Sequence, residues 1–194
     1  MATRTVTRRD LLKLAAGGMA GLAVASCGGT PAPTATEELI APTVMAVLCP
    51  LGHPSPPHQS MCRQCGAQIP PQDPFPMPRP TLGRLVLSTG DVVPLDRSVL
   101  LGRAPKVNES IPVARRPHVV KVPSPQKDVS RNHLEVTLEG WLVLVRDLGA
   151  TNGSTVQLPG HAPMRLGTNQ TEPIQPGTFV SLADEVTFTF EVGQ

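Results

Sequence analysis

From Leu82 to the end of the chain, apolar and polar residues alternate with a period of two. The clearest run is 186–192 (VTFTFEV), which has the pattern of a half-buried strand. Turn signals such as Thr89-Gly90 and Glu139-Gly140 separate the runs, and no segment shows a convincing helical period. Many short strands with frequent turns predict an all-β sandwich. The clearest predicted strands are 84–88, 91–95, 98–101, 118–122, 133–138, 141–146, 178–182 and 186–192.

Upstream of this region the alternation is absent, and the composition changes the picture. The 194 residues include 23 prolines, four Phe, one Trp and no Tyr, which indicates a modest core flanked by extended segments. The net charge is +2, and the first 26 residues alone carry +3. The remainder is therefore close to neutral, which argues against a nucleic-acid-binding protein.

The N-terminus has the features of an export signal. A basic segment, 7–13 (TRRDLLK), precedes an uncharged run, 14–26, that is too short to span a bilayer. The segment resembles a twin-arginine signal, and Val24-Ala25-Ser26-Cys27 resembles a lipobox, which implies lipidation at Cys27 and a lipid-anchored protein at the cell membrane after export. Two alternatives stay open. The segment can be an ordinary amphipathic helix, or translation can start at Met45 and give a cytoplasmic protein.

The remaining three cysteines lie within 17 residues of one another and indicate a metal site. Cys62-Arg-Gln-Cys65-Gly is a turn that presents two thiolates to one point, and Cys49 and His53 complete a Cys3His set that zinc favours. His58 is a rival fourth ligand, and a loop with reactive or disulfide-forming thiols is the alternative. The pattern resembles a small zinc ribbon, in which a structural Zn²⁺ supplies most of the stability.

Three short motifs lie between the predicted strands. They are Gly102-Arg103, then Ser130-Arg131-Asn132-His133, then 147–154 (DLGATNGS). In this order they resemble the pattern of forkhead-associated (FHA) domains, over roughly 81–192, and the resemblance implies a β-sandwich of about 11 short strands. The resemblance departs from the family in one respect, because the 26 residues between Arg103 and Ser130 are more than we expect.

The resemblance implies a site for phosphothreonine peptides. It assigns Arg103 and Ser130 to the phosphate, Thr151 to the phosphate or its surroundings, and Asn152 to the peptide backbone. Arg131 is compatible with a phosphate or acidic contact. The same resemblance makes three further residues structural. These are Gly102 at a tight strand end, His133 as a brace between loops, and Gly153 in a turn with positive φ.

The expected function is a non-catalytic adaptor in Ser/Thr kinase signalling that binds phosphothreonine-containing proteins. Ser130, His133 and Asp147 do not suit a hydrolase, because no nucleophile-elbow motif accompanies them and no P-loop is present. The alternative is a phosphate-independent scaffold at the cell envelope.

The sequence therefore divides into five segments. We predict a signal over 1–27, a flexible linker over 28–46, a zinc-ribbon-like module over 47–69, a Pro-rich spacer over 70–80 and the FHA-like domain over 81–192.

Overall fold

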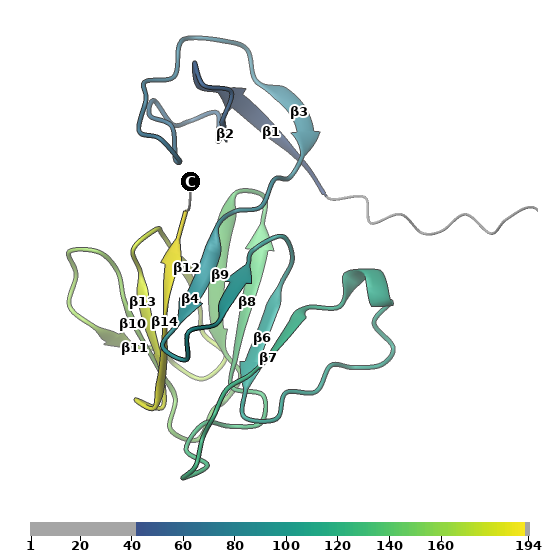
Figure 1. The fold of residues 1–194 in the computed structure, drawn as a ribbon, viewed down its shortest axis with the longest axis vertical. Helices are drawn as coiled ribbons and strands as arrows, with labels where there is room; N and C mark the ends of the chain where they lie inside the picture. The colour runs from purple at the N-terminus through teal and green to yellow at the C-terminus, as the bar shows by residue number, and fades with distance from the viewer. Residues whose placement is uncertain (1–41, 193–194) are drawn as a thin grey trace, which may run out of the picture. The chain divides into compact units, whose positions relative to one another are not determined.

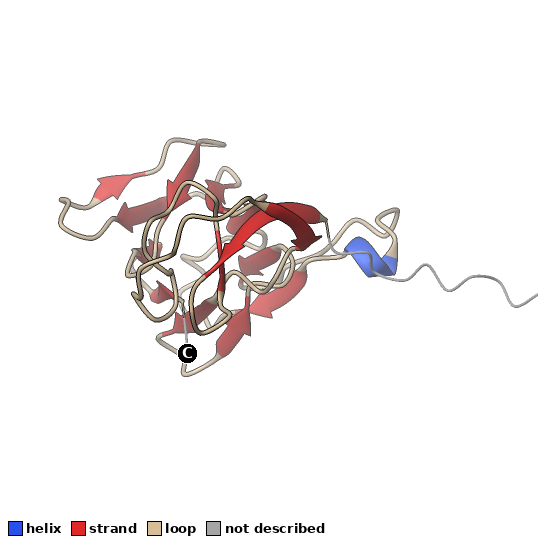
Figure 2. Cartoon of the chain, turned by 90° about the horizontal axis from the view of Figure 1, so that it is seen from above, coloured by secondary structure: helices blue, strands red, loops and turns tan. Residues whose placement is uncertain are grey.

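The computed structural model describes residues 42–192 (Figure 1). The predicted signal, its lipidation site Cys27 and most of the predicted linker lie outside the described residues. Within the described part the secondary structure is almost entirely strand, with one short 3-10 helix at Val113–Arg115 (Figure 2). None of its helices has the length and apolar character needed to cross a membrane.

Eleven of the described strands, β4 to β14, form the two sheets of a β-sandwich, and all neighbouring strands in them are antiparallel except β6 and β7. The first sheet has the order β11-β10-β13-β14-β4-β5 and the second β12-β9-β8-β6-β7. Their bounds are β4 Arg84–Leu87, β5 Val92–Pro94, β6 Val99–Gly102, β7 His118–Lys121, β8 Leu134–Glu139, β9 Leu142–Asp147, β10 Ser154–Gln157, β11 Met164–Arg165, β12 Thr171–Ile174, β13 Phe179–Leu182 and β14 Val186–Glu191. The predicted all-β fold is confirmed.

The alternating pattern explains which faces are buried. In β14 every second residue is buried, and Phe188 and Phe190 are each 1% exposed. These side chains join a continuous apolar cluster that fills the space between the two sheets. Burial of apolar surface on this scale is the main source of stability for a sandwich.

One pairing departs from the antiparallel rule. Strands β6 and β7 run parallel, with Val99 opposite His118 and Gly102 opposite Lys121. A parallel neighbour requires a crossover connection, and the long insertion between residues 103 and 117 provides it. The insertion is therefore part of the sheet topology.

A separate three-stranded sheet precedes the sandwich in the chain. Its order is β2-β1-β3, with β1 at Thr43–Leu48, β2 at Pro54–Ser55 and β3 at Phe75–Pro78. Part of the segment expected to be a linker thus lies in β1, and part of the expected Pro-rich spacer pairs as β3 with β1. Proline is tolerated in β3 because it is an edge strand.

Several described side chains connect the small sheet and the sandwich, among them Arg79, whose Nη1 donates to the Leu138 carbonyl oxygen at 3.0 Å. Arg63 donates from Nη2 to the Leu82 carbonyl oxygen at 2.5 Å, and its guanidinium lies 5.4 Å from the centre of the Trp141 ring. The Trp141 Nε1–H in turn donates to the Met45 carbonyl oxygen at 2.8 Å. Trp141 lies at the β8–β9 turn, the end of that hairpin opposite to the Leu134–Asp147 pair.

Candidate functional site

Three loops that are distant in sequence meet at the end of the β8–β9 hairpin where β8 begins and β9 ends. They follow β6, precede β8 and follow β9. Backbone hydrogen bonds hold the first two loops together, from Arg103 N to Ser130 O at 3.0 Å and from His133 N to Leu101 O at 2.9 Å. The three predicted motifs therefore lie together at this end of the β8–β9 hairpin.

Gly102 allows this close approach of the loops. A Cβ atom at this position would overlap the carbonyl oxygen of Arg131. Its φ angle does not require glycine, so the reason for glycine here is space and not backbone conformation. Gly153 differs, because its φ of 68° lies in the left-handed region that favours glycine.

His133 connects two of the loops through both ring nitrogens. The Ser130 backbone N–H donates to His133 Nδ1 at 3.0 Å, so Nε2 carries the proton and donates to the Gly153 carbonyl oxygen at 3.0 Å. The side chain is fully buried, and this burial lowers its pKa despite the Gly153 hydrogen bond and the negative charge of Asp147. A neutral imidazole with both nitrogens engaged has no free acceptor for the Ser130 hydroxyl proton.

Asp147 organises the third loop, a role that the sequence analysis did not assign. Its Oδ1 accepts hydrogen bonds from the N–H groups of Gly149 at 2.9 Å and Ala150 at 2.8 Å, and its Oδ2 accepts from the Ser154 hydroxyl at 2.7 Å. A buried carboxylate that accepts several hydrogen bonds fixes the turn. An Asp two residues before a glycine is the signal that indicates such a turn.

The loops surround an open polar pocket with a volume of about 480 Å³. Arg103, Ser130, Arg131 and Thr151, four of the five residues predicted to bind phosphopeptide, lie in its wall. The remaining lining residues are Ala104, Lys106, Lys127 and Asn132, which sequence analysis did not select.

Two hydrogen-bonding features suit the pocket to an anion. The Thr151 N–H donates to the Ser130 Oγ at 3.2 Å, which leaves the Ser130 hydroxyl proton free to donate into the pocket. Arg103 Nε is buried and has no hydrogen-bond partner within the described residues. Buried polar groups are normally satisfied, so an incoming acceptor would complete the set.

Asn152, the fifth predicted residue, does not line the pocket. Its Nδ2 donates to the backbone oxygen of Asp128 at 3.2 Å and to the Asp128 Oδ1 at 3.1 Å. The side chain therefore joins the loop after β9 to the loop before β8. Its contact with a peptide backbone stays a prediction.

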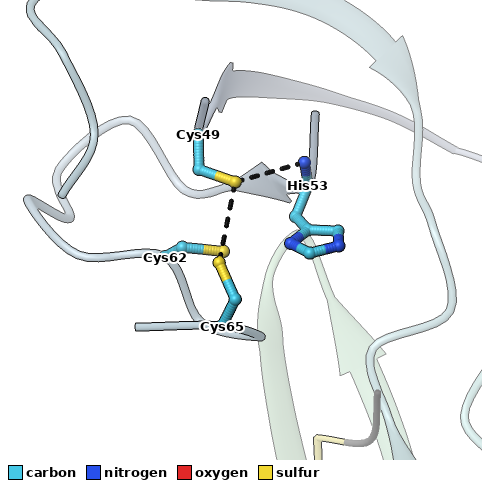
Figure 3. A group of neighbouring side chains, drawn as sticks. All are labelled: Cys49, His53, Cys62 and Cys65. Carbon is cyan, nitrogen blue, oxygen red and sulfur yellow. Dashed lines mark hydrogen bonds between the residues drawn. The ribbon is translucent and has the colours of Figure 1, made fainter. Parts of the chain in front are cut away.

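A second cluster lies in the small sheet and its loops, where the Cys49, His53, Cys62 and Cys65 ligand atoms all lie within 4.8 Å of one another (Figure 3). The Cys49 and Cys65 sulfurs are 3.8 Å apart. Two thiolates on one tetrahedral zinc, each at about 2.3 Å, are separated by about 3.8 Å, whereas a disulfide requires about 2.05 Å. His58, the rival ligand, is exposed and outside the cluster.

The surroundings of the cluster also suit a metal. The His53 and Gln64 N–H groups each donate to a cysteine sulfur at 3.4 Å, and His53 Nδ1 is buried without a hydrogen-bond partner among the described residues. Burial raises the pKa of the Cys62 thiol, but hydrogen bonds from the backbone at Cys65 and Gln64 and from the neighbouring thiols outweigh it and lower the pKa to about 6. The donors therefore fit a cation that prefers thiolate and imidazole.

Comparison with known families finds one match. The model of the FHA domain family matches residues 99–183, so this part of the chain is similar to that family in sequence. No curated protein matches the chain.

Solved structures similar to this chain include the following three. The FhaA FHA domain, complexed with the intracellular domain of Rv3910, is 26% identical with a TM-score of 0.39, and the match covers 56% of this chain and 98% of that one. Mycobacterium tuberculosis EmbR, in complex with a low-affinity phosphopeptide, is 21% identical with a TM-score of 0.40, and the match covers 57% of this chain and 24% of that one. A structure from a study of phosphothreonine-dependent FHA domain interactions is 24% identical with a TM-score of 0.36, and the match covers 56% of this chain and 96% of that one.

Proposed function

We propose that this chain is a non-catalytic adaptor that binds a phosphothreonine-containing partner at the pocket formed by Arg103, Ser130, Arg131 and Thr151. The observation that carries the proposal is the convergence of these four side chains, from three separate loops, on one polar pocket. The match of residues 99–183 to the FHA domain family supports it.

The chemistry of the pocket suits a phosphate monoester. Phosphothreonine carries nearly two negative charges and three acceptor oxygens. Arg103 offers a fork of N–H donors, and Ser130 offers a hydroxyl. Charge-assisted hydrogen bonds of this kind contribute about 1.5–3 kcal/mol each. His133 is a brace and not a base, which supports binding without catalysis.

Fluorescence polarisation tests the proposal with the full-length chain and a degenerate phosphothreonine peptide pool. We expect saturable binding to the phosphothreonine pool, weaker binding to phosphoserine and none to unphosphorylated peptide. Arg103→Ala should weaken binding by about tenfold to a hundredfold, since it removes a charge-assisted contact. Arg84→Ala, which alters an exposed arginine paired with Glu191, is the matched control. Equal binding of phosphorylated and unphosphorylated peptides would overturn the proposal and favour a phosphate-independent scaffold.

A structural zinc ion in the Cys49, His53, Cys62 and Cys65 cluster is the second part of the proposal. The sulfur separation and the unpartnered His53 nitrogen support it. When bound, zinc would crosslink the segment that contains Cys49 and His53 to the segment that contains Cys62 and Cys65. Zinc analysis of purified protein should give one metal per chain.

The N-terminal sequence supports a proposal about location. We propose that the chain is exported and lipidated at Cys27, on the strength of the signal-like segment that precedes it. Globomycin treatment or Cys27→Ser should change the electrophoretic mobility and membrane fractionation of the full-length protein. An unchanged distribution would favour the cytoplasmic alternative.

A further inference from the structure

The pocket carries more positive charge than one phosphate requires. Four of its eight lining residues are cations, and none of the eight is Asp or Glu. The proposed phosphate contacts use Arg103 and Arg131. Lys106 and Lys127 add two further charges, and no salt bridge within residues 42–192 involves any of the four.

Charge balance shows what a single phosphate would leave. A bound phosphothreonine brings between about −1.5 and −2, against four positive charges in the wall. About two positive charges then remain without a counterion. Asp128 is next to Lys127 in the chain, but its carboxylate accepts a hydrogen bond from the Asn152 amide and lies outside the pocket lining.

The fold holds Lys106 at the pocket. The Asn132 side chain forms two hydrogen bonds with the Lys106 backbone. Lys106 N donates to Asn132 Oδ1 at 2.8 Å, and Asn132 Nδ2 donates to Lys106 O at 3.2 Å. This clamp joins the start of the insertion to the Ser130 loop, although the two positions are 26 residues apart. Lys106 is therefore presented by a fixed backbone while its side chain stays exposed.

A different set of contacts holds Lys127. Its N–H donates to the Ser124 carbonyl oxygen at 3.1 Å, and its φ of 62° is unusual for a residue other than glycine. The Ser124 hydroxyl donates to Glu185 Oε2 at 2.5 Å and accepts from the Val129 N–H at 3.0 Å. This turn, bound to the β13–β14 connection, places the lysine in the pocket wall.

We propose that Lys106 and Lys127 form a second anion subsite, so that the preferred ligand is a peptide with another anionic side chain close to its phosphothreonine. This inference rests on the proposed function. A carboxylate and a second phosphate share the required chemistry, and the experiment distinguishes them.

The test uses the full-length chain and three labelled pools of phosphothreonine peptides. One pool has neutral flanking residues, one has a Glu among the flanking positions, and one has a phosphoserine there. We expect the acidic pools to bind about three- to tenfold more tightly than the neutral pool, because each exposed charge pair contributes a modest amount. The advantage should shrink as salt is raised from 50 to 500 mM (roughly 14 to 4 Å in Debye length).

Variants separate the subsite from a general charge effect. Lys106→Ala/Lys127→Ala should reduce the acidic-to-neutral affinity ratio to about one, and Lys106→Glu/Lys127→Glu should reverse it. Lys121→Ala, at an exposed lysine of β7 outside the pocket, should leave the ratio unchanged. Circular dichroism melts confirm that each variant is folded.

The outcomes distinguish the two proposals. If no pool binds in a phosphothreonine-dependent way, the proposed function itself is wrong. If all three phosphothreonine pools bind equally, or if the double alanine variant keeps the preference, the function stands and the second subsite is wrong. A preference for the phosphoserine pool over the Glu pool would identify a doubly phosphorylated ligand, and equal preference would identify an acidic one.

Discussion

The small Cys/His sheet and the β-sandwich are stable for different reasons. The sandwich buries a continuous cluster of 21 apolar residues between two sheets. The small sheet has few buried apolar residues, mainly Val44, Ala46 and Val47, and its strands β2 and β3 are short. Below about 40 residues a hydrophobic core seldom suffices and a metal or disulfide is usually needed. The comparison supports the proposed zinc site, on which the small sheet would depend, whereas the sandwich depends on burial.

Loss of the metal should produce the largest effect. Cys62→Ser removes a buried thiolate, and zinc binding by comparable small modules is worth about 10–16 kcal/mol in apparent terms. We expect zinc content to fall from one per chain towards zero. Hydrogen exchange should show loss of protection in β1, with β8 and β9 still protected.

His58→Ser is the control, because it alters an exposed histidine outside the cluster, and it should retain the metal. If Cys62→Ser keeps a full complement of zinc, or keeps β1 protected, the small sheet does not depend on ligand chemistry.

Truncation of a core side chain should destabilise the sandwich and leave the zinc content unchanged. Phe188→Ala removes a side chain that is 1% exposed, and such changes cost about 3–5 kcal/mol of unfolding free energy. Phe179, which is 42% exposed, gives a matched Phe→Ala control with a much smaller effect. Urea titration measures both. Under conditions where Phe188→Ala is still folded, its zinc content should stay at one per chain, and loss of zinc would show that the two regions are not independent.

The link between the two regions should contribute less. Arg63→Ala removes a hydrogen bond to Leu82 and the contact with the Trp141 ring. A cation–π contact and a neutral-acceptor hydrogen bond together are worth about 1–2 kcal/mol. Because Trp141 lies at the opposite end of the β8–β9 hairpin from the pocket, phosphopeptide affinity should change less than twofold. A large loss of affinity would show that the small sheet shapes the pocket.

The protonation of His133 should give a smaller, pH-dependent effect on the stability of the sandwich. Burial lowers the pKa of this side chain in the folded state, below the ordinary value of 6.5. As pH falls below 6.5 the unfolded chain takes up a proton that the folded chain resists, so the free energy of unfolding decreases, by at most about 1.4 kcal/mol per pH unit. Urea midpoints at pH 7, 6 and 5 measure the slope.

His133→Gln should lower stability at every pH and flatten this slope, because it removes the titrating group. The matched change His161→Gln, at an exposed histidine, should leave the slope as it is in the unaltered chain. An unchanged slope in His133→Gln would assign the pH dependence to another group.

Sequence pattern predicted β4 to β9, β13 and β14, and it missed β10, β11 and β12 of the sandwich as well as the six-residue strand β1. The alternation in 186–192 was sufficient for β14. Strand β11 has two residues, and β12 contains Pro173, so neither shows a period. Strand β3 was interpreted as a spacer because its prolines suggested polyproline, yet an edge position accommodates them. Short strands are decided by their partners in the sheet, which local sequence does not reveal.

The residues of the candidate site likewise divide into those that sequence motifs predicted and those that they did not. Arg103, Ser130 and Thr151 stand in recognisable motifs, and the structure brings them to one pocket. Lys106 and Lys127 have no motif. They reach the pocket through the Asn132 clamp and the Ser124 turn, which join segments that are distant in sequence. The Asp147-Leu148-Gly149 pattern indicates a turn, but the sequence analysis did not assign Asp147 this role.

The most direct measurement is an NMR titration of the ¹⁵N-labelled full-length chain with a phosphothreonine peptide selected from the pool. The account predicts that the amide signals of Arg103, Ser130 and Thr151 shift saturably, while those of β1 and the Cys/His cluster do not. The unphosphorylated peptide should cause no shifts. Shifts centred on the small sheet, or equal shifts with both peptides, would contradict the assignment of phosphothreonine binding to this pocket.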